Sequence, residues 1–139
     1  MIKKKRKQKT IAVLVEEAAK LMQLYVRIKS ADEFGISQCV TCGVKKHYKE
    51  LQGGHFIGRK WLATKLMEEN INPQCPCCNG PLRGNMIAYT LYMQDMYGRE
   101  FVEELQRLKH QSKKYYRNEI ESIKHDLRVK IRELEQVIL

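Results

Sequence analysis

A cysteine quartet carries the chemistry that is easiest to recognise in this chain. Cys39 and Cys42 form one Cys-x-x-Cys pair, and Cys75 and Cys78 form a second pair farther along. Two such pairs at this separation can close one tetrahedral zinc site. Cys77 is the spare thiol, because Cys75 with Cys78 already gives the usual ligand spacing. The sequence therefore predicts a structural Zn²⁺ ion.

A histidine and an asparagine lie close to this quartet. His55 follows two glycines in the loop between the pairs, and Asn79 directly follows the last cysteine. His55 could be a zinc ligand, a packed core residue or a general base; four cysteines already satisfy zinc, and a neutral imidazole can accept a proton from water. The Asn79 carbonyl oxygen is a candidate ligand for Mg²⁺, which would neutralise a scissile phosphate. This arrangement suggests phosphodiester chemistry rather than zinc binding alone.

Charge restricts the class of partner. The formal net charge is +10, with 26 Lys and Arg against 16 Asp and Glu. A polyanion is the natural ligand of such a chain, and nucleic acid fits better than a membrane surface. No stretch approaches the apolar length of a transmembrane span, and no secretory signal is recognisable. We therefore expect an intracellular protein, in which cysteines bind metal rather than form disulfides. A basic protein with no polyanion target is the alternative.

Basic residues gather in three places: the N-terminal residues 1–10, the positions after the His55 loop, and the stretch 107–117. Residues 1–10 form an arm that we expect to be disordered until it meets a phosphate backbone. Arg59, just after the His55 loop, could also grip the scissile phosphate. A solvated basic surface is the alternative for these residues. The candidate DNA contacts are Lys3, Lys4, Lys5, Arg6, Lys7, Arg59, Lys60, Lys109, His110, Lys113 and Lys114.

Helical periodicity flanks the cysteine region on both sides. Residues 11–35 carry apolar residues at helical spacing, which predicts an amphipathic helix to about residue 30. Residues 36–85 hold the cysteines and all three prolines, so we expect short strands and loops, then a short helix from near Cys78. Residues 86–139 predict helices, the last over about 112–139 with one narrow apolar stripe. Such a stripe needs a partner, either the first helix or a second copy of the chain. Asn85 is the expected N-cap of the helix that follows it.

The order of these residues resembles the HNH, or ββα-metal, nuclease motif. In that family the histidine ends the first strand and an asparagine opens the helix after the last cysteine, which His55 and Asn79 would match. A structural asparagine fixes the loop, as Asn70 would here. The layout is also similar to phage recombination endonuclease VII. The position before the histidine, usually an aspartate metal ligand, is Gly54 here, so Gln52, Glu50 or water would supply the missing oxygen.

The chain is more similar still to the Rap (NinG) family of phage recombination nucleases. The resemblance runs from about Cys39 to the C-terminal helix, and such sequences also tolerate glycine before the histidine. It implies Mg²⁺- or Mn²⁺-dependent cleavage of branched recombination intermediates. The residues that carry it are Gly54-His55-Phe56, Asn70-Ile71, Gln74-Cys75, Cys78-Asn79, Gly84-Asn85, Tyr89, Tyr97-Gly98 and Leu108-Lys109-His110.

Together these features predict an α+β, mostly helical fold in which a zinc-stapled ββα-metal core is flanked by helices. The expected function is structure-selective hydrolysis of Holliday junctions and D-loops, in the cytoplasm of an infected or lysogenic bacterial host. His55 would activate water, and His55, Asn79 and Gln52 would hold the catalytic Mg²⁺. Two nicks per junction favour a homodimer through the long helices, and host or phage recombination proteins are further partners. The alternatives are a non-catalytic zinc-containing DNA-binding accessory protein and a restriction or homing enzyme.

Overall fold

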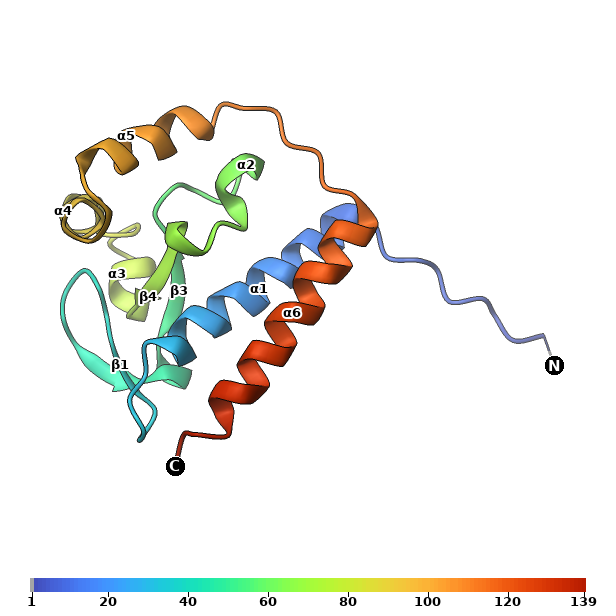
Figure 1. The fold of residues 1–139 in the computed structure, drawn as a ribbon, viewed down its shortest axis with the longest axis horizontal. Helices are drawn as coiled ribbons and strands as arrows, with labels where there is room; N and C mark the ends of the chain where they lie inside the picture. Colours follow the sequence, from blue (N-terminus) through green and yellow to red (C-terminus); the bar gives the residue numbers. More distant parts are fainter. Residues whose placement is uncertain (1) are drawn as a thin grey trace.

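The computed structural model describes residues 2–139 and shows a mixed α and β fold in which most ordered residues are helical, as predicted (Figure 1). In chain order the elements are α1 (Ile11–Lys29), β1 (Ile36–Gln38), β2 (Lys45–His47), η1 (Tyr48–Glu50), β3 (Gln52–His55), α2 (Leu62–Lys65), η2 (Glu68–Asn70), β4 (Ile71–Gln74), α3 (Pro76–Asn79), α4 (Met86–Tyr97), α5 (Arg99–Leu108) and α6 (Arg117–Glu135).

Helices α1 and α6 lie side by side (Figure 1), and the apolar stripe of α6 packs on α1. Lys124 on α6 is only 3% exposed and its Nζ lies 2.7 Å from the Glu17 carboxylate of α1. The stripe therefore finds its partner within the same chain, the first of the two alternatives, and it is not open to a second copy. The homodimer stays a prediction, and the apolar stripe of α6 can no longer serve as its interface. The buried side chains of this contact include Leu14, Val15, Ala18, Met22, Ile120, Leu127 and Ile131.

A two-stranded antiparallel sheet packs against the other side of α1. Strands β3 and β4 pair with Gln52 opposite Gln74 and His55 opposite Ile71. Gly53 allows the close approach, because a Cβ at this position would lie 2.5 Å from the Gln23 side chain of α1. The His55-bearing strand is therefore fixed between α1 and the buried strand β4.

Helices α4 and α5 cover a second apolar cluster beside this sheet. Tyr89 and Met93 of α4 are fully buried against Phe56 and Ile57, which follow β3. The Tyr89 hydroxyl donates to the Gly54 carbonyl at 2.7 Å, so α4 also holds the backbone of β3. Burial raises the pKa of this phenol well above its ordinary value, which keeps it a donor.

Two expectations about helix ends were wrong, and a third, Asn85 as the N-cap of α4, was confirmed in position. The last helix begins at Arg117 rather than near residue 112, and residues 112–116 are extended. Helix α3 begins at Pro76, and Asn79 is its last residue instead of opening a helix. Asn85 stands at the N-cap of α4, but its side chain makes no cap hydrogen bond; its backbone is left-handed with φ of 48°.

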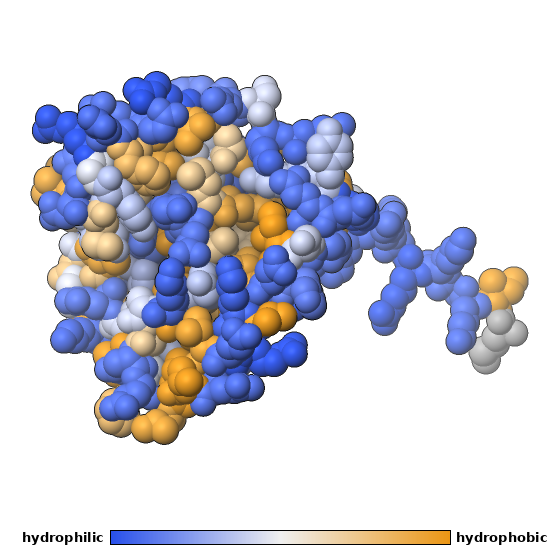
Figure 2. Space-filling view, viewed as in Figure 1, coloured by the Kyte–Doolittle hydropathy of each residue, from blue (hydrophilic) through white to orange (hydrophobic). Residues whose placement is uncertain are grey.

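Residues 2–10 carry no helix or strand and leave the body as a mostly hydrophilic arm (Figure 2). Thr10 begins α1, because its hydroxyl accepts from the Val13 amide. Within residues 2–139, none of the helices combines the length and hydropathy needed to cross a bilayer.

Candidate metal centre and polar cleft

The four paired cysteines converge on one point. Their Sγ atoms all lie within 4.8 Å of one another, and those of Cys42 and Cys75 are 3.7 Å apart. Tetrahedral zinc with Zn–S bonds of about 2.3 Å requires sulfur separations of about 3.8 Å, so the cluster could hold one zinc ion. Cys77 is exposed and lies outside the cluster, as the spacing predicted.

The cluster joins two distant pieces of chain. Cys39 and Cys42 lie on the turn between β1 and β2, where Gly43 has φ of 83°. Cys75 lies between the end of β4 and the start of α3, and its Sγ accepts a hydrogen bond from the amide of Cys78 in α3. A bound zinc would therefore fix α3, and Asn79 at its end, against the strands.

Polar groups next to the sulfurs orient the cluster. The Thr41 hydroxyl lies 3.3 Å from Cys39 Sγ, and Gln74 Nε2 donates to that hydroxyl at 3.1 Å. The Asn85 amide lies 3.6 Å from Cys78 Sγ. Such outer partners fix the ligands of a metal site. The sequence analysis assigned no role to Thr41 or Gln74, although both stand within two residues of a paired cysteine.

A polar cleft of about 530 Å³ opens beside this cluster. It brings together four residues that the sequence analysis selected for phosphodiester chemistry: Gln52, His55, Arg59 and Asn79. Arg27 and Arg83 also line it and had not been selected. Among the described residues no carboxylate lines the cleft, so three guanidinium groups make it a site for anions.

The hydrogen bonding of His55 fixes its tautomer. Its Nε2 lies 2.9 Å from the Lys65 carbonyl oxygen, which can only accept, so Nε2 carries the proton. Nδ1 is then left with a free lone pair. Burial, more than any other cause, lowers the pKa of His55 below its ordinary value, so the ring is neutral at pH 7. A neutral imidazole with a free Nδ1 can accept a proton.

Asn70 fixes the loop between β3 and β4. The side chain is fully buried; its Oδ1 accepts from the Ile57 amide at 2.7 Å, and its Nδ2 donates to the Ile57 and Thr64 carbonyls at 3.0 Å each. The loop that carries Arg59 is therefore tied at both ends to one amide side chain.

Asn79 and Gln52 meet at the cleft wall. The Asn79 Nδ2 donates to the Gln52 Oε1 at 2.8 Å, which leaves the Asn79 Oδ1 free. Glu50, the charged alternative, is exposed and does not line the cleft. At Gly54, where the related motif has aspartate, a Cβ would collide with the Gln74 Oε1. Only neutral oxygens could therefore hold a divalent cation here, which is a sparse donor set for a hard ion.

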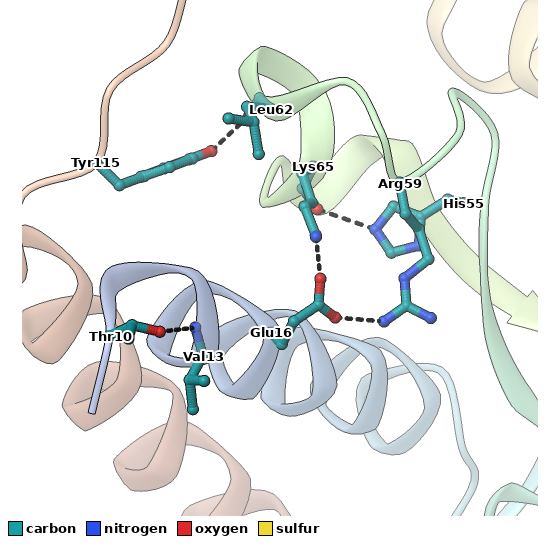
Figure 3. A network of polar contacts seen from close by, with 8 residues as sticks. All are labelled: Thr10, Val13, Glu16, His55, Arg59, Leu62, Lys65 and Tyr115. Carbon is teal, nitrogen blue, oxygen red and sulfur yellow. Dashed lines mark hydrogen bonds and ion pairs between the residues drawn. The ribbon is translucent and has the colours of Figure 1, made fainter. Parts of the chain in front are cut away.

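One carboxylate outside the cleft organises its basic groups. Glu16 of α1 pairs with Arg59 at 2.9 Å and also with the Lys65 ammonium (Figure 3). The hydrogen bond from Lys65 is the largest cause that lowers the pKa of Glu16. Lys65 in turn supplies the carbonyl that holds His55 (Figure 3). Sequence reasoning missed Glu16 and Lys65, because no local pattern joins residues so far apart.

The remaining candidate DNA contacts separate into two groups. Lys60, Lys109 and His110 surround Trp61, with the lysine Nζ atoms 4.8 and 5.2 Å from the indole centroid and the imidazole centroid 4.9 Å away. The segment 109–116, a turn followed by five residues without helix or strand, is thus held against the loop that follows β3, and it carries Lys113 and Lys114. The second group is the arm, with exposed Lys3, Lys4, Lys5, Arg6 and Lys7.

A family profile described as Bacteriophage Lambda NinG protein matches residues 1–137. This chain belongs to the NinG family. It is 24% identical over 123 residues to Protein ninG of Escherichia phage lambda, an alignment that covers 86% of this chain and 56% of that protein. The same identity relates it to Protein ninG of Escherichia phage 933W and of Enterobacteria phage VT2-Sa, with 57% of each covered. The chain therefore spans little more than half the length of these relatives. No solved structure matches it.

Proposed function

We propose that this NinG-family protein is a metal-dependent endonuclease that cuts branched DNA such as Holliday junctions and D-loops. The observation that carries the proposal is one cleft that holds a neutral histidine with a free Nδ1 and three arginines. A base and a set of phosphate-binding cations in one cavity match the needs of phosphodiester hydrolysis.

In the proposed reaction His55 Nδ1 accepts a proton from water as the water oxygen attacks phosphorus, and the bond from phosphorus to the leaving oxygen of the DNA strand breaks. The Lys65 carbonyl holds the imidazole during the transfer, and stabilises the imidazolium that forms. Arg59 contacts the non-bridging oxygens, where negative charge develops. Asn79 and Gln52 would hold Mg²⁺ or Mn²⁺, which supplies charge stabilisation at the leaving oxygen.

Selectivity for branches would come from shape, because the basic residues outside the cleft can contact only phosphates without reading bases. The segment 109–116 and the arm carry such residues outside the helices and strands. They could follow DNA strands that leave the cleft in different directions. The resemblance of the sequence to phage recombination nucleases also supports branched DNA as the substrate.

The test is cleavage of matched linear, forked and four-way DNA with Mg²⁺ or Mn²⁺. We expect the wild-type protein to nick the branched forms, and His55→Ala to lower the rate by about 10²–10⁴ without weakening binding. His125→Ala is the matched control, because His125 is exposed on α6. Equal rates for His55→Ala and wild type would refute the assignment of the base.

A second candidate is a non-catalytic DNA-binding accessory protein. Within residues 2–139 no carboxylate lines the cleft, and this favours the second candidate, since Mg²⁺ binds weakly to neutral amides alone. Tight, salt-sensitive binding of branched DNA with no cleavage in either metal would establish this second function.

A further inference from the structure

The turn between α3 and α4 has a backbone that suits glycine at three consecutive positions. Arg83, Gly84 and Asn85 have φ of 50°, 91° and 48°. Glycine accepts such values freely and asparagine accepts them well, but an arginine there is strained. Strain of this kind persists at functional sites when the surrounding structure fixes it.

The contacts that fix this turn do not use the Arg83 side chain. The Gly84 amide donates to the Cys78 carbonyl at 2.8 Å, and the Gln74 amide donates to the Gly84 carbonyl at 2.8 Å. The Arg83 backbone amide donates to the Gly80 carbonyl at 2.8 Å. Every one of these bonds would survive with glycine at position 83. The guanidinium is therefore not required for the local fold.

Arg83 differs from the other two arginines of the cleft. Arg27 donates to the carbonyls of Gln23, Tyr48 and Leu51, and Arg59 pairs with Glu16. Arg83 is exposed, and within residues 2–139 its guanidinium takes part in no ion pair and donates no hydrogen bond. It lines the cleft on the α3 side, four residues after Asn79. A strained, exposed cation in an anion-binding cleft is explained by a ligand.

We propose that Arg83 binds a backbone phosphate of DNA in the cleft, from the side formed by α3. The planar guanidinium can contact two phosphate oxygens at once, which a lysine cannot do. The proposal rests on the proposed function for the presence of DNA in the cleft, but it does not depend on hydrolysis. Arg83 and Arg59 would then hold the strand from two separate elements.

Arg83→Gly is the decisive variant, because it removes the cation and supplies the residue that the backbone prefers. We expect its melting temperature to equal or exceed that of wild type, and its affinity for four-way DNA without divalent metal to fall about tenfold. The slope of log K against log salt should decrease in magnitude by about 0.9, the contribution of one phosphate contact. Arg83→Lys should bind with intermediate affinity.

Arg128→Gln is the control for loss of one positive charge, since Arg128 is exposed on α6. The proposal is overturned if Arg83→Gly binds as tightly as Arg128→Gln, or if it loses thermal stability together with affinity. If the wild-type protein never cleaves DNA but Arg83→Gly still weakens DNA binding, the nuclease proposal is refuted and the role of Arg83 is kept. If the wild-type protein cleaves branched DNA but Arg83→Gly leaves DNA binding unchanged, the nuclease proposal is kept and the role of Arg83 is refuted. Loss of a protein partner, with DNA binding intact, would also overturn it.

Discussion

Replacement of Asn70 by alanine removes the one side chain that ties the β3–β4 loop together. The change leaves two buried backbone groups without their partner, the amide and the carbonyl of Ile57. The Thr64 carbonyl loses its bond from Asn70 but still accepts from the Met67 amide at 3.2 Å. A buried polar group that loses its hydrogen bond costs roughly 1–3 kcal/mol. We therefore expect Asn70→Ala to lower the free energy of unfolding by about 2–4 kcal/mol.

A loss of this size is a large part of the roughly 5–15 kcal/mol that stabilises a typical domain. Urea unfolding of the zinc-loaded protein, followed by far-ultraviolet circular dichroism, measures it directly. Asn118→Ala is the matched control, because Asn118 is exposed in α6 and its replacement should change stability by no more than about 0.5 kcal/mol. If Asn70→Ala costs less than about 1 kcal/mol, the loop does not depend on this amide and its role here is wrong.

Three further predictions concern the zinc cluster, the carboxylate of α1 and pH. Cys78→Ser should abolish stoichiometric zinc and cooperative unfolding, whereas Cys77→Ser should change neither, as metal analysis and melting curves will show. Glu16→Gln should lower kcat several-fold with little change in KM, because Arg59 of the cleft and Lys65, whose carbonyl holds His55, lose their partner; Glu121→Gln, at an exposed position of α6, is its control. Because burial lowers the pKa of His55, the cleavage rate should stay constant as the pH falls from neutral to 6.5. The rate should decline only below pH 6.5, where the buried imidazole becomes protonated.

Each of these has a clear contrary result. Zinc retained by Cys78→Ser would exclude a four-thiolate site. Equal kcat values for Glu16→Gln and Glu121→Gln would show that the Glu16 contacts are structural only. Folding favours the neutral form of His55, because the pKa of the ring is lower in the folded protein than in the unfolded chain. The contribution of His55 to the free energy of unfolding is therefore fully present above pH 6.5 and is lost as the pH falls through the lowered folded pKa. A cleavage midpoint above pH 6.5 would contradict that direction.

The helices were predictable where their signals are local. Apolar residues at helical spacing predicted α1 with nearly correct ends, since the helix expected to about residue 30 ends at Lys29. The α6 start was not predictable, because Tyr115 is held by a hydrogen bond from its hydroxyl to the Leu62 carbonyl at 2.7 Å. A contact across more than fifty residues keeps the preceding segment extended, and no pattern within residues 112–116 reports it.

Sequence alone determined which four cysteines could hold a zinc ion, the positive charge and the residue types suited to phosphate chemistry, because ligand spacing and composition are properties of the chain. Only the tertiary structure decided that Gln52, His55, Arg59 and Asn79 line one cleft, since the pairing of β3 with β4 and the cysteine cluster bring their segments together. It also placed Arg83 there on strained backbone. Hydrogen bonds and packing between distant segments fix such positions, and the sequence of any single segment does not show which distant segment it will contact.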